Sequence, residues 1–353
     1  MMSESVSFST QVVRWQAVHG RSHLPWQQTR EPYRVWLSEV MLQQTQVSTV
    51  LDYYPRFLAR FPDVNALAEA SEDDVLALWS GLGYYSRARN LHRCAQQVMA
   101  LHGGQFPRTA EVLQSLPGIG RSTAGAIAAF CFSERVAILD ANVRRVLTRA
   151  LGFGADLAVA ANERALWDRA TDLLPRTQLE QSMPRYTQGL MDLGAMVCLA
   201  RKPQCLLCPV QSQCVAQQEG APENYPVKTR KLVRKAQSWW LLLLRDSQGR
   251  VRLERRPSSG IWSGLHCVPM YAQRADAIAH SAVASAKRVV ELPPFLHVLT
   301  HRDFHLHPVL VEVAAGVDAD AGAAADSNSA WVTRAQWTAL GLPAPIRKLL
   351  DTA

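Results

Sequence analysis

The sequence predicts two domains, an all-α domain followed by an α+β domain. Its 353 residues exceed what one ordinary hydrophobic core requires. Apolar residues recur at helical spacing as far as residue 198, whereas beyond residue 237 they fall in short β-like runs. Between these parts lies a segment that combines prolines with a run of Lys and Arg. We therefore expect an all-α domain over 1–220, a basic linker over 221–236 and an α+β domain over 237–353.

Each helix of the first domain is expected where apolar positions repeat every three or four residues between Gly- or Pro-containing turns. The strands of the second domain are expected where β-branched and other apolar residues form short runs. The predicted helices span 8–19, 32–60, 65–80, 86–102, 109–115, 143–151, 161–174 and 185–198. The predicted strands span 238–245, 250–255, 294–300 and 305–313, and two last helices span 334–340 and 344–351.

Composition restricts the classes of partner. Lys and Arg number 38 and Asp and Glu 30, and the resulting net charge of +8 favours a polyanionic partner. The run 239–244 is far shorter than the roughly 20 apolar residues of a bilayer span. No basic and apolar leader typical of secretion is visible at the start. We expect a cytoplasmic protein with reduced cysteines and no contact with membranes.

A glycine-rich turn and a downstream aspartate organise the first domain. Gly118 and Gly120 lie in the tight turn 116–120, and a run of small residues that can form a helix follows. The start of such a helix presents free backbone N–H groups to an anion such as a phosphate. Asp140 follows an apolar stretch and precedes the basic segment that contains Arg144. An ordinary helical hairpin is the simpler interpretation, but the placed acid favours chemistry on nucleic acid.

Glu39 is a second candidate acid. On a helix, Val35, Trp36 and Leu42 would share its face, so the carboxyl group would be desolvated and its pKa raised. A raised pKa suits a general acid near neutral pH. The alternative is a surface Glu on an amphipathic helix. The polar cluster 43–46 that follows can meet base edges or fill a gap in a base stack.

An aromatic pair follows two glycines in 81–85. Tyr84 and Tyr85 on such a turn could stack on bases or wedge between them, or could anchor the core.

Four cysteines form a metal-site pattern. They lie within seventeen residues, with Pro203 and Pro209 in the intervening loops. Thiolate ligands alone permit either Zn²⁺ or an iron–sulfur cluster. The four residues are Cys198, Cys205, Cys208 and Cys214.

Taken together, these motifs resemble those of the MutY-type adenine DNA glycosylases, a helix-hairpin-helix family related to endonuclease III. The most specific segments are 38–47, 81–85, the hairpin through Asp140, 191–196 and the four cysteines. The resemblance implies a helix-hairpin-helix glycosylase domain with an iron–sulfur cluster loop at 198–214, followed by a Nudix-like domain. It also implies excision of adenine paired with 8-oxoguanine or guanine in double-stranded DNA, and a [4Fe–4S] cluster on the cysteines. We expect a monomer associated with the nucleoid.

The two acids fit this chemistry. Adenine leaves deoxyribose readily only after protonation of a ring nitrogen, and the sugar then develops positive charge. On this hypothesis Glu39 protonates N7 and later activates water, while Asp140 stabilises the cationic sugar or bonds to it transiently. Endonuclease III-like enzymes resemble this hairpin but carry a lysine nucleophile where this chain has Ser122. Ser122 therefore predicts a monofunctional glycosylase.

The resemblance assigns further residues to DNA and base contacts. Gly118, Gly120, Ser122 and Arg144 would belong to the DNA-binding hairpin. Gln44 and Tyr84 would fill or wedge the base stack, and Arg21, Trp26 and Gln188 would line the adenine pocket. The family usually has arginine after that tryptophan, whereas this chain has Gln27.

The second domain resembles a Nudix fold through 260–265. The glutamates that a Nudix catalytic box needs for Mg²⁺ are missing, because no Glu occurs between Glu254 and Glu291. The family reads 8-oxoguanine through a Phe-Ser-His loop, to which Leu299, Thr300 and His301 correspond here. Ordinary strand-end residues are the alternative.

Two other functions remain open at this point. One is an endonuclease III-like glycosylase and lyase, which Ser122 and the extra domain disfavour. The other is a metal-stabilised DNA-binding protein without catalysis, which the presence of both Glu39 and Asp140 disfavours.

Overall fold

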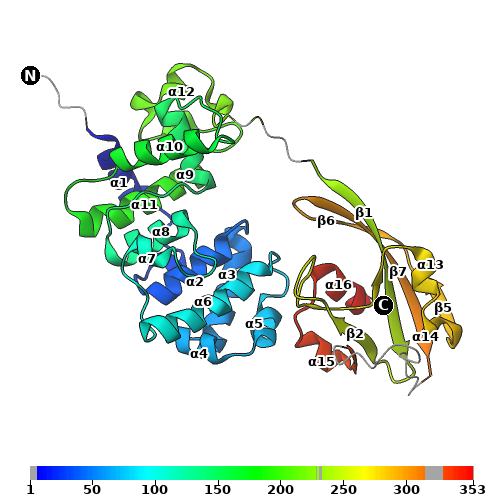
Figure 1. The fold of residues 1–353 in the computed structure, drawn as a ribbon. Coiled ribbons are helices and arrows are strands. Elements are labelled where there is room, and N and C mark those ends of the chain that lie inside the picture. Colours follow the sequence, from blue (N-terminus) through cyan, green and yellow to red (C-terminus); the bar gives the residue numbers. More distant parts are fainter. Residues whose placement is uncertain (1–5, 228, 230–232, 315–328, 353) are drawn as a thin grey trace, which may run out of the picture. The chain divides into compact units, whose positions relative to one another are not determined.

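The computed structural model of the chain describes residues 6–227, 229, 233–314 and 329–352 (Figure 1). Contacts divide it into two compact units. The first unit comprises Met1–Glu69 and Arg93–Lys231, and the second comprises Ala70–His92 and Leu232–Ala353. The division differs from the predicted domains, because 70–92 groups with the C-terminal part of the chain.

The first unit is helical. Its helices are α1 (Phe8–His19), α2 (Pro32–Leu42), α3 (Val47–Arg60), α4 (Val64–Glu69), α7 (Ala110–Leu113), α8 (Arg121–Phe132), α9 (Ala141–Leu151), α10 (Ala160–Asp172), α11 (Leu179–Met196) and α12 (Val215–Gln218). Helix α6 (Ser86–His102) begins in the second unit and ends in the first. Short 3₁₀ turns are η1 (Pro25–Gln27), η2 (Cys205–Leu207), η3 (Gln211–Gln213) and η4 (Pro222–Asn224).

Two of the predicted helices are each divided in two. The predicted helix 32–60 is interrupted between α2 and α3, where Gln44 has a left-handed backbone with φ 56°. The predicted helix 65–80 ends at Glu69 and restarts as α5 (Glu72–Trp79), because the Ser71 side chain accepts a hydrogen bond from the Asp74 N–H and caps the new helix. The spacing of apolar residues in the sequence does not reveal such breaks, because the same apolar pattern continues in the next helix.

The core of the first unit brings the later helices together. Helix α11 packs against α1, α8 and α9. Val143, Leu147, Tyr186 and Leu193 are among the buried side chains of this cluster. Helix α11 begins at Leu179, six residues before the predicted start, and continues through Pro184.

The second unit contains a mixed sheet in the order β3-β2-β1-β7-β5 (Figure 1). Strands β1 and β7 are parallel from the pair Lys235 and Arg302 to the pair Asp246 and Val313, and the other pairings are antiparallel. The strands are β1 (Lys235–Asp246), β2 (Val251–Arg255), β3 (His266–Cys267), β4 (Met270–Tyr271), β5 (Arg288–Glu291), β6 (Phe295–Val298), β7 (Arg302–Val313) and β8 (Ser329–Val332). Besides α5 and the start of α6, the described helices of the second unit are α13 (Arg274–Ile278), α14 (Ser281–Ala284), α15 (Arg334–Thr338) and α16 (Ala344–Thr352).

The predicted fold class, an all-α part followed by an α+β part, is confirmed. Two boundaries differ in detail. The predicted linker ends early, because Lys235 and Ala236 already pair with β7. The predicted strand 294–300 stops at Val298, and a turn closed by the Leu299 N–H and the Arg302 carbonyl leads into β7. Residues 228 and 230–232 of the linker lie outside the described residues.

Within the second unit, α5 and the turn after it pack against the last part of the chain. The Ser80 Oγ and the Tyr85 hydroxyl donate hydrogen bonds to the Leu342 carbonyl, at 3.0 and 2.8 Å. A Cβ at Gly341 would lie 2.8 Å from the Leu76 Cβ, so glycine permits this close approach. The aromatic turn at 81–85 is thus held partly by residues near the C-terminus.

Over the part of the chain that the structure describes, no helix is both long and apolar enough to span a bilayer.

Candidate active site

The glycine turn leads into α8 as the sequence predicts. Gly118 has φ 76°, in the left-handed region, and the buried Ile119 donates its N–H to the Leu116 carbonyl. Gly120 is the N-cap of α8, and no side chain caps the helix there. The first N–H groups of a twelve-residue helix therefore remain available for an anion.

Asp140 begins α9. Its Oδ1 accepts a hydrogen bond of 2.7 Å from the Val143 N–H and so caps the helix. Small residues bring the neighbouring helices close to this point. A Cβ at Gly125 would lie 2.7 Å from the Ala137 carbonyl, and one at Gly194 would lie 2.6 Å from the Asn142 Cβ. The position of Asp140 is therefore fixed by the packing of α8 and α11.

Ser122 is fixed by the backbone before Asp140. Its Oγ accepts a hydrogen bond of 3.1 Å from the Leu139 N–H. The hydroxyl thus supports the segment that delivers Asp140.

Glu39 lies on α2 and faces a pocket of about 260 Å³. Trp26 and Gln188, two of the three residues predicted for the adenine pocket, line the same cavity. Trp26 is buried and makes an edge-on contact with Tyr54 at a ring distance of 5.5 Å. The complete lining is Gln16, Ala17, Ser22, Trp26, Gln27, Thr29, Arg30, Val35, Ser38, Glu39, Phe130, Pro184, Arg185 and Gln188.

Desolvation by the surrounding protein and the charge of Asp140 raise the pKa of Glu39 to about 8. Desolvation also raises the pKa of Asp140, but four groups oppose that shift. They are the backbone N–H groups of Val143 and Asn142 and the side chains of Arg145 and Arg144. No such group lowers the pKa of Glu39. Of the two carboxyl groups, Glu39 is therefore the one that holds a proton at neutral pH.

Arg21 is not among the residues that line this pocket. Its Nε donates to the Asp192 Oδ1 at 2.7 Å, and its backbone N–H donates to the other carboxylate oxygen at 3.0 Å. Asp192 is fully buried, so the ion pair anchors the loop after α1 to α11. Gln188 also donates to Asp192, at 2.9 Å. The contact of Arg21 with adenine stays a prediction, and the structure adds that Asp192 holds the guanidinium in place.

Several lining residues were not predicted. Phe130 on α8 and Arg185 on α11 reach the pocket only because these helices pack against each other. No local motif distinguishes them. Arg30 and Gln27 could have been found from their place in the loop that carries Trp26.

The residues predicted to contact the DNA stack lie on exposed turns. Gln44 is exposed on the turn between α2 and α3, and Tyr84 is 43% exposed with φ 49°. Within the second unit, the Tyr84 hydroxyl and the Thr300 Oγ1 are hydrogen-bonded. Thr300 and its neighbours Leu299 and His301 form the β6–β7 turn. Their contacts with DNA remain predictions.

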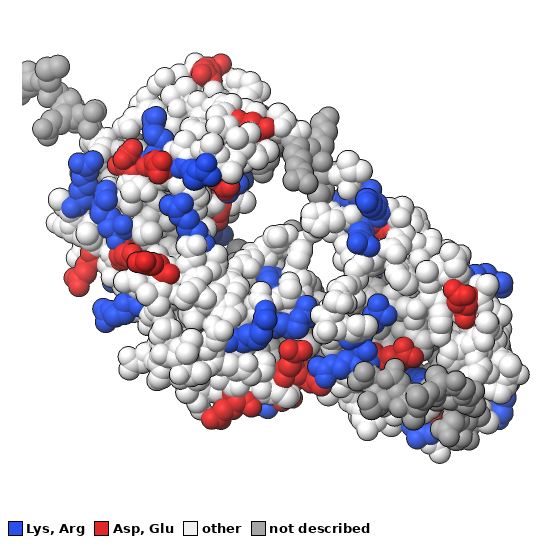
Figure 2. Space-filling model, in the orientation of Figure 1, with Lys and Arg blue, Asp and Glu red and all other residues white. Residues whose placement is uncertain are grey.

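Arg144 forms an ion pair with Glu163. On the face drawn in Figure 2, acidic and basic side chains alternate rather than forming one broad basic surface.

The four predicted cysteines line one small cavity, together with Arg149, Val197 and two prolines. Arg149 is buried and donates to the Cys198 Sγ at 3.3 Å and to the Leu199 carbonyl at 2.6 Å. Burial raises the pKa of the Cys208 thiol to about 12. Among the described residues, no three His, Cys, Asp or Glu side chains are placed to hold a single metal ion.

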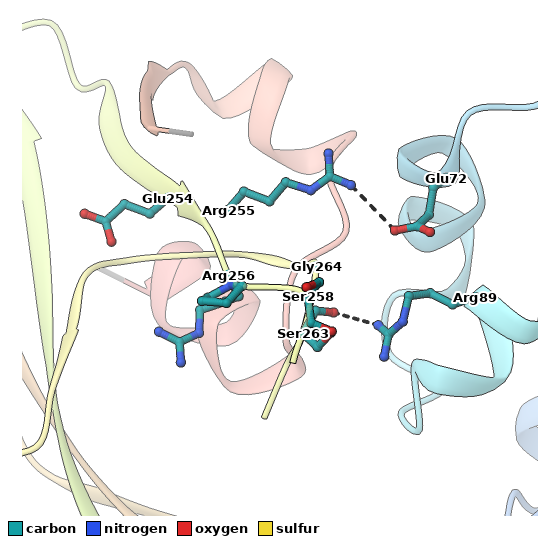
Figure 3. Close-up of a pocket in the computed structure, with 9 residues that line it drawn as sticks. Glu72, Arg89, Glu254, Arg255, Arg256, Ser258, Ser263 and Gly264 are labelled. Atoms are coloured by element: carbon teal, nitrogen blue, oxygen red, sulfur yellow. Dashed lines mark hydrogen bonds and ion pairs between the residues drawn. The ribbon is translucent and has the colours of Figure 1, made fainter. Parts of the chain in front are cut away.

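A third cavity, of about 690 Å³, lies in the second unit (Figure 3). Arg255 extends toward Glu72 at 3.6 Å, and the Arg89 Nη1 donates to the Ser263 carbonyl at 2.6 Å. Glu254 precedes Arg255 on β2 and points to the other side. The carboxylates of Glu72 and Glu254 therefore do not point toward a common position in this cavity.

Comparisons with known proteins agree with this arrangement. A profile of the HhH-GPD superfamily base excision DNA repair protein matches residues 37–170, and a NUDIX domain profile matches 240–352. The adenine DNA glycosylase of Rattus norvegicus is 44% identical over 226 residues, which are 62% of this chain and 43% of that protein. A thermostable thymine-DNA glycosylase structure has a TM-score of 0.54 and 28% identity, and the match covers 60% of this chain and 95% of that one.

The adenine DNA glycosylase of Buchnera aphidicola subsp. Acyrthosiphon pisum (strain APS) extends the match to both parts of the chain. It is 33% identical over 347 residues, which cover 98% of this chain and 97% of that protein. Because similarity at this level spans both chains almost completely, this chain belongs to the family of adenine DNA glycosylases, which are DNA N-glycosylase enzymes.

Proposed function

We propose that this enzyme hydrolyses the N-glycosidic bond of adenine mispaired with 8-oxoguanine or guanine in double-stranded DNA and leaves the strand uncut. The observation that carries the proposal is the protonated acid in a base-sized pocket, namely Glu39 with its pKa raised to about 8 beside Trp26 and Gln188. The names of the relatives support adenine as the base.

The reaction begins when the target nucleotide leaves the base stack and adenine enters the pocket. Glu39 gives its proton to a ring nitrogen, so that the base leaves with the electron pair of the glycosidic bond. The anionic Asp140 stabilises the positive charge that develops on the sugar. The Glu39 carboxylate then takes a proton from water, and the resulting hydroxide adds to the sugar. An abasic site and free adenine result, and Glu39 is protonated again.

The absence of an amine at position 122 supports a monofunctional reaction. A lyase reaction through a Schiff base needs an amine nucleophile at the sugar, whereas Ser122 presents a hydroxyl that is bonded to the Leu139 N–H. The endonuclease III-like alternative predicts a covalent adduct that borohydride traps. We expect no such adduct above background.

We propose that the four cysteines hold a [4Fe–4S] cluster. Their thiols line one small cavity together. A cluster has its iron atoms at separate corners, so it needs thiolates around a common volume. Cys198, Cys205, Cys208 and Cys214 would hold it, and they must lose their protons to do so. When bound, the cluster would cross-link this loop and add a redox centre.

The second unit supports a role in reading the base opposite adenine. Thr300 on the β6–β7 turn reaches the hydroxyl of Tyr84, which is the residue predicted to enter the stack. Variants Thr300→Ala and His301→Ala should reduce excision opposite 8-oxoguanine more than excision opposite guanine. Equal losses on both pairs would exclude lesion reading. The proposal includes action as a monomer, in the cytoplasm at the nucleoid.

The central experiment is strand scission by alkali after incubation with duplexes that pair adenine with 8-oxoguanine, guanine or thymine. We expect scission of the adenine strand opposite the first two bases only, and no scission before alkali. A protein that binds these duplexes without releasing adenine would support the non-catalytic alternative.

A further inference from the structure

Arg87, in the first turn of α6, is a buried cation beside the turn that carries Tyr84. Its guanidinium carbon lies 5.2 Å from the ring centre of Trp79 and 5.5 Å from the ring centre of Tyr84. One of its Nη atoms donates a hydrogen bond of 3.1 Å to the Gly83 carbonyl. Desolvation lowers the pKa of Arg87 to about 10, so the group keeps its charge at neutral pH. A buried charge is costly unless other groups replace the lost water, so these contacts fix the position of the guanidinium.

The turn before Arg87 has an unusual backbone. Gly81, Gly83 and Tyr84 have φ values of 105°, 71° and 49°. Glycine adopts positive φ easily, whereas tyrosine does so at a cost in free energy and needs surrounding contacts that hold it there. The Trp79 indole N–H and the Arg87 side chain both donate to the Gly83 carbonyl, at 3.1 Å each. Trp79 is fully buried, so the carbonyl directly before Tyr84 is tied to the core.

The ring of Tyr84 is held in place although the residue is 43% exposed. The guanidinium of Arg87 lies over the ring, and the hydroxyl is hydrogen-bonded to the Thr300 Oγ1 at 2.5 Å. A free aromatic side chain samples several rotamers and loses that freedom when it enters a base stack. A ring that is already oriented loses less entropy on entry. The cation over the ring adds a favourable electrostatic contact to this arrangement.

We propose that Arg87 is a positioning residue, which keeps the Tyr84 ring oriented for entry into the base stack of mispaired DNA. Arg87 acts through the ring and through the Gly83 carbonyl, and needs no contact with DNA itself. This inference rests on the proposed function, in which Tyr84 enters the stack. Removal of Arg87 should therefore weaken recognition of a mispair only while Tyr84 is present.

A double-mutant cycle tests this dependence. The measured quantity is the dissociation constant for a fully paired duplex divided by that for a duplex with 2′-fluoro-deoxyadenosine opposite 8-oxoguanine. The fluorine disfavours positive charge on the sugar, so the second duplex is bound without being cleaved. Arg87→Met should lower the ratio about fivefold when Tyr84 is present, and by less than about twofold in the Tyr84→Ala background. Equal lowering in both backgrounds would mean a purely structural role and would overturn the assignment.

The matched control is Arg89→Met, on the same helix, which removes a guanidinium that donates to the Ser263 carbonyl. Its effect on the ratio should be the same with and without Tyr84. If Arg87→Met does not fold, Arg87→Lys takes its place in the cycle. A lysine ammonium keeps the charge but presents no flat face to the two rings, so the ratio should again fall only when Tyr84 is present.

An unchanged ratio in Arg87→Met, or in Tyr84→Ala alone, would also overturn the inference. Release of adenine by the wild type from the unmodified mispaired duplex would then leave the proposed function standing. If the wild type releases no adenine, the proposed function itself fails, and the inference fails with it.

Discussion

The charge of Asp140 contributes to the raised pKa of Glu39, although the two residues lie on helices far apart in the sequence. The surroundings of the two carboxyl groups favour different protonation states. Asp140 caps α9 and has N–H and guanidinium groups that favour its anion, whereas Glu39 is desolvated and lacks them. One acid is thus suited to donate a proton and the other to stay negative. The predictions below test this division of roles and the parts of the structure that maintain it.

The pH dependence of base release should report Glu39. Because its carboxyl must be protonated to act, single-turnover release should fall as pH rises through about 8, and Glu39→Gln should abolish release. The same pKa also affects stability. From 4.5 to about 8 the folded state binds this proton and the unfolded state does not, so the free energy of unfolding should fall over that window.

Urea denaturation at several pH values measures the stability effect. Glu39→Gln should remove most of the decline between pH 4.5 and 8, and Glu69→Gln, at an exposed position outside the pocket, should not change it. An unchanged decline in Glu39→Gln would refute the shifted pKa.

Asp140 has two separable roles, in capping and in charge. Asn caps helices as well as Asp does, so Asp140→Asn should keep the stability of the wild type yet lose at least about 100-fold in adenine release. Asp140→Ala should lose the same activity and about 1 kcal/mol of stability as well. Single-turnover kinetics and denaturation on the same preparations separate the two effects. Normal release by the Asn variant would remove Asp140 from the mechanism.

Ser122 should act as a support for the segment before Asp140. Ser122→Ala leaves the Leu139 N–H without its acceptor, and we expect a loss of about 1–3 kcal/mol in the free energy of unfolding. Ser115→Ala is the matched control, because the Ser115 hydroxyl is exposed and bonds only within its own turn. Its effect should stay within about 0.5 kcal/mol. Equal effects of the two substitutions would contradict the supporting role.

Cysteines inside and outside the cavity should differ in their effect on the iron and sulfide content of the protein. Replacing Cys198, Cys205, Cys208 or Cys214 with Ala should lower the iron and sulfide content of the purified protein and its stability, because each thiolate would hold one corner of the cluster. Cys131→Ala, at a cysteine outside this cavity, should keep the wild-type content. Zinc in place of iron would contradict the cluster.

The sequence alone determined the features that depend on near neighbours. The glycine turn before α8 follows from local backbone preferences and lies where it was predicted. The apolar neighbours that desolvate Glu39 follow from local helical periodicity. The helix breaks at 43–46 and 70–71 were missed because an apolar face that resumes after an interruption looks continuous in the sequence. The early start of α11 was missed for the related reason that buried neighbours support a helix beyond its own apolar pattern.

Only the tertiary structure decided which groups are paired and which are left without a partner. Arg21 is predicted for the pocket from the resemblance, and the structure adds that it pairs with the buried Asp192 on α11, because a buried carboxylate needs a cation. Packing of α2 and its preceding loop with α8 and α11 likewise left the Gln27 amide without a partner beside Glu39. The sequence names the candidate groups, but pairing and desolvation are set by residues distant in the chain, so only the folded structure assigns each group its role.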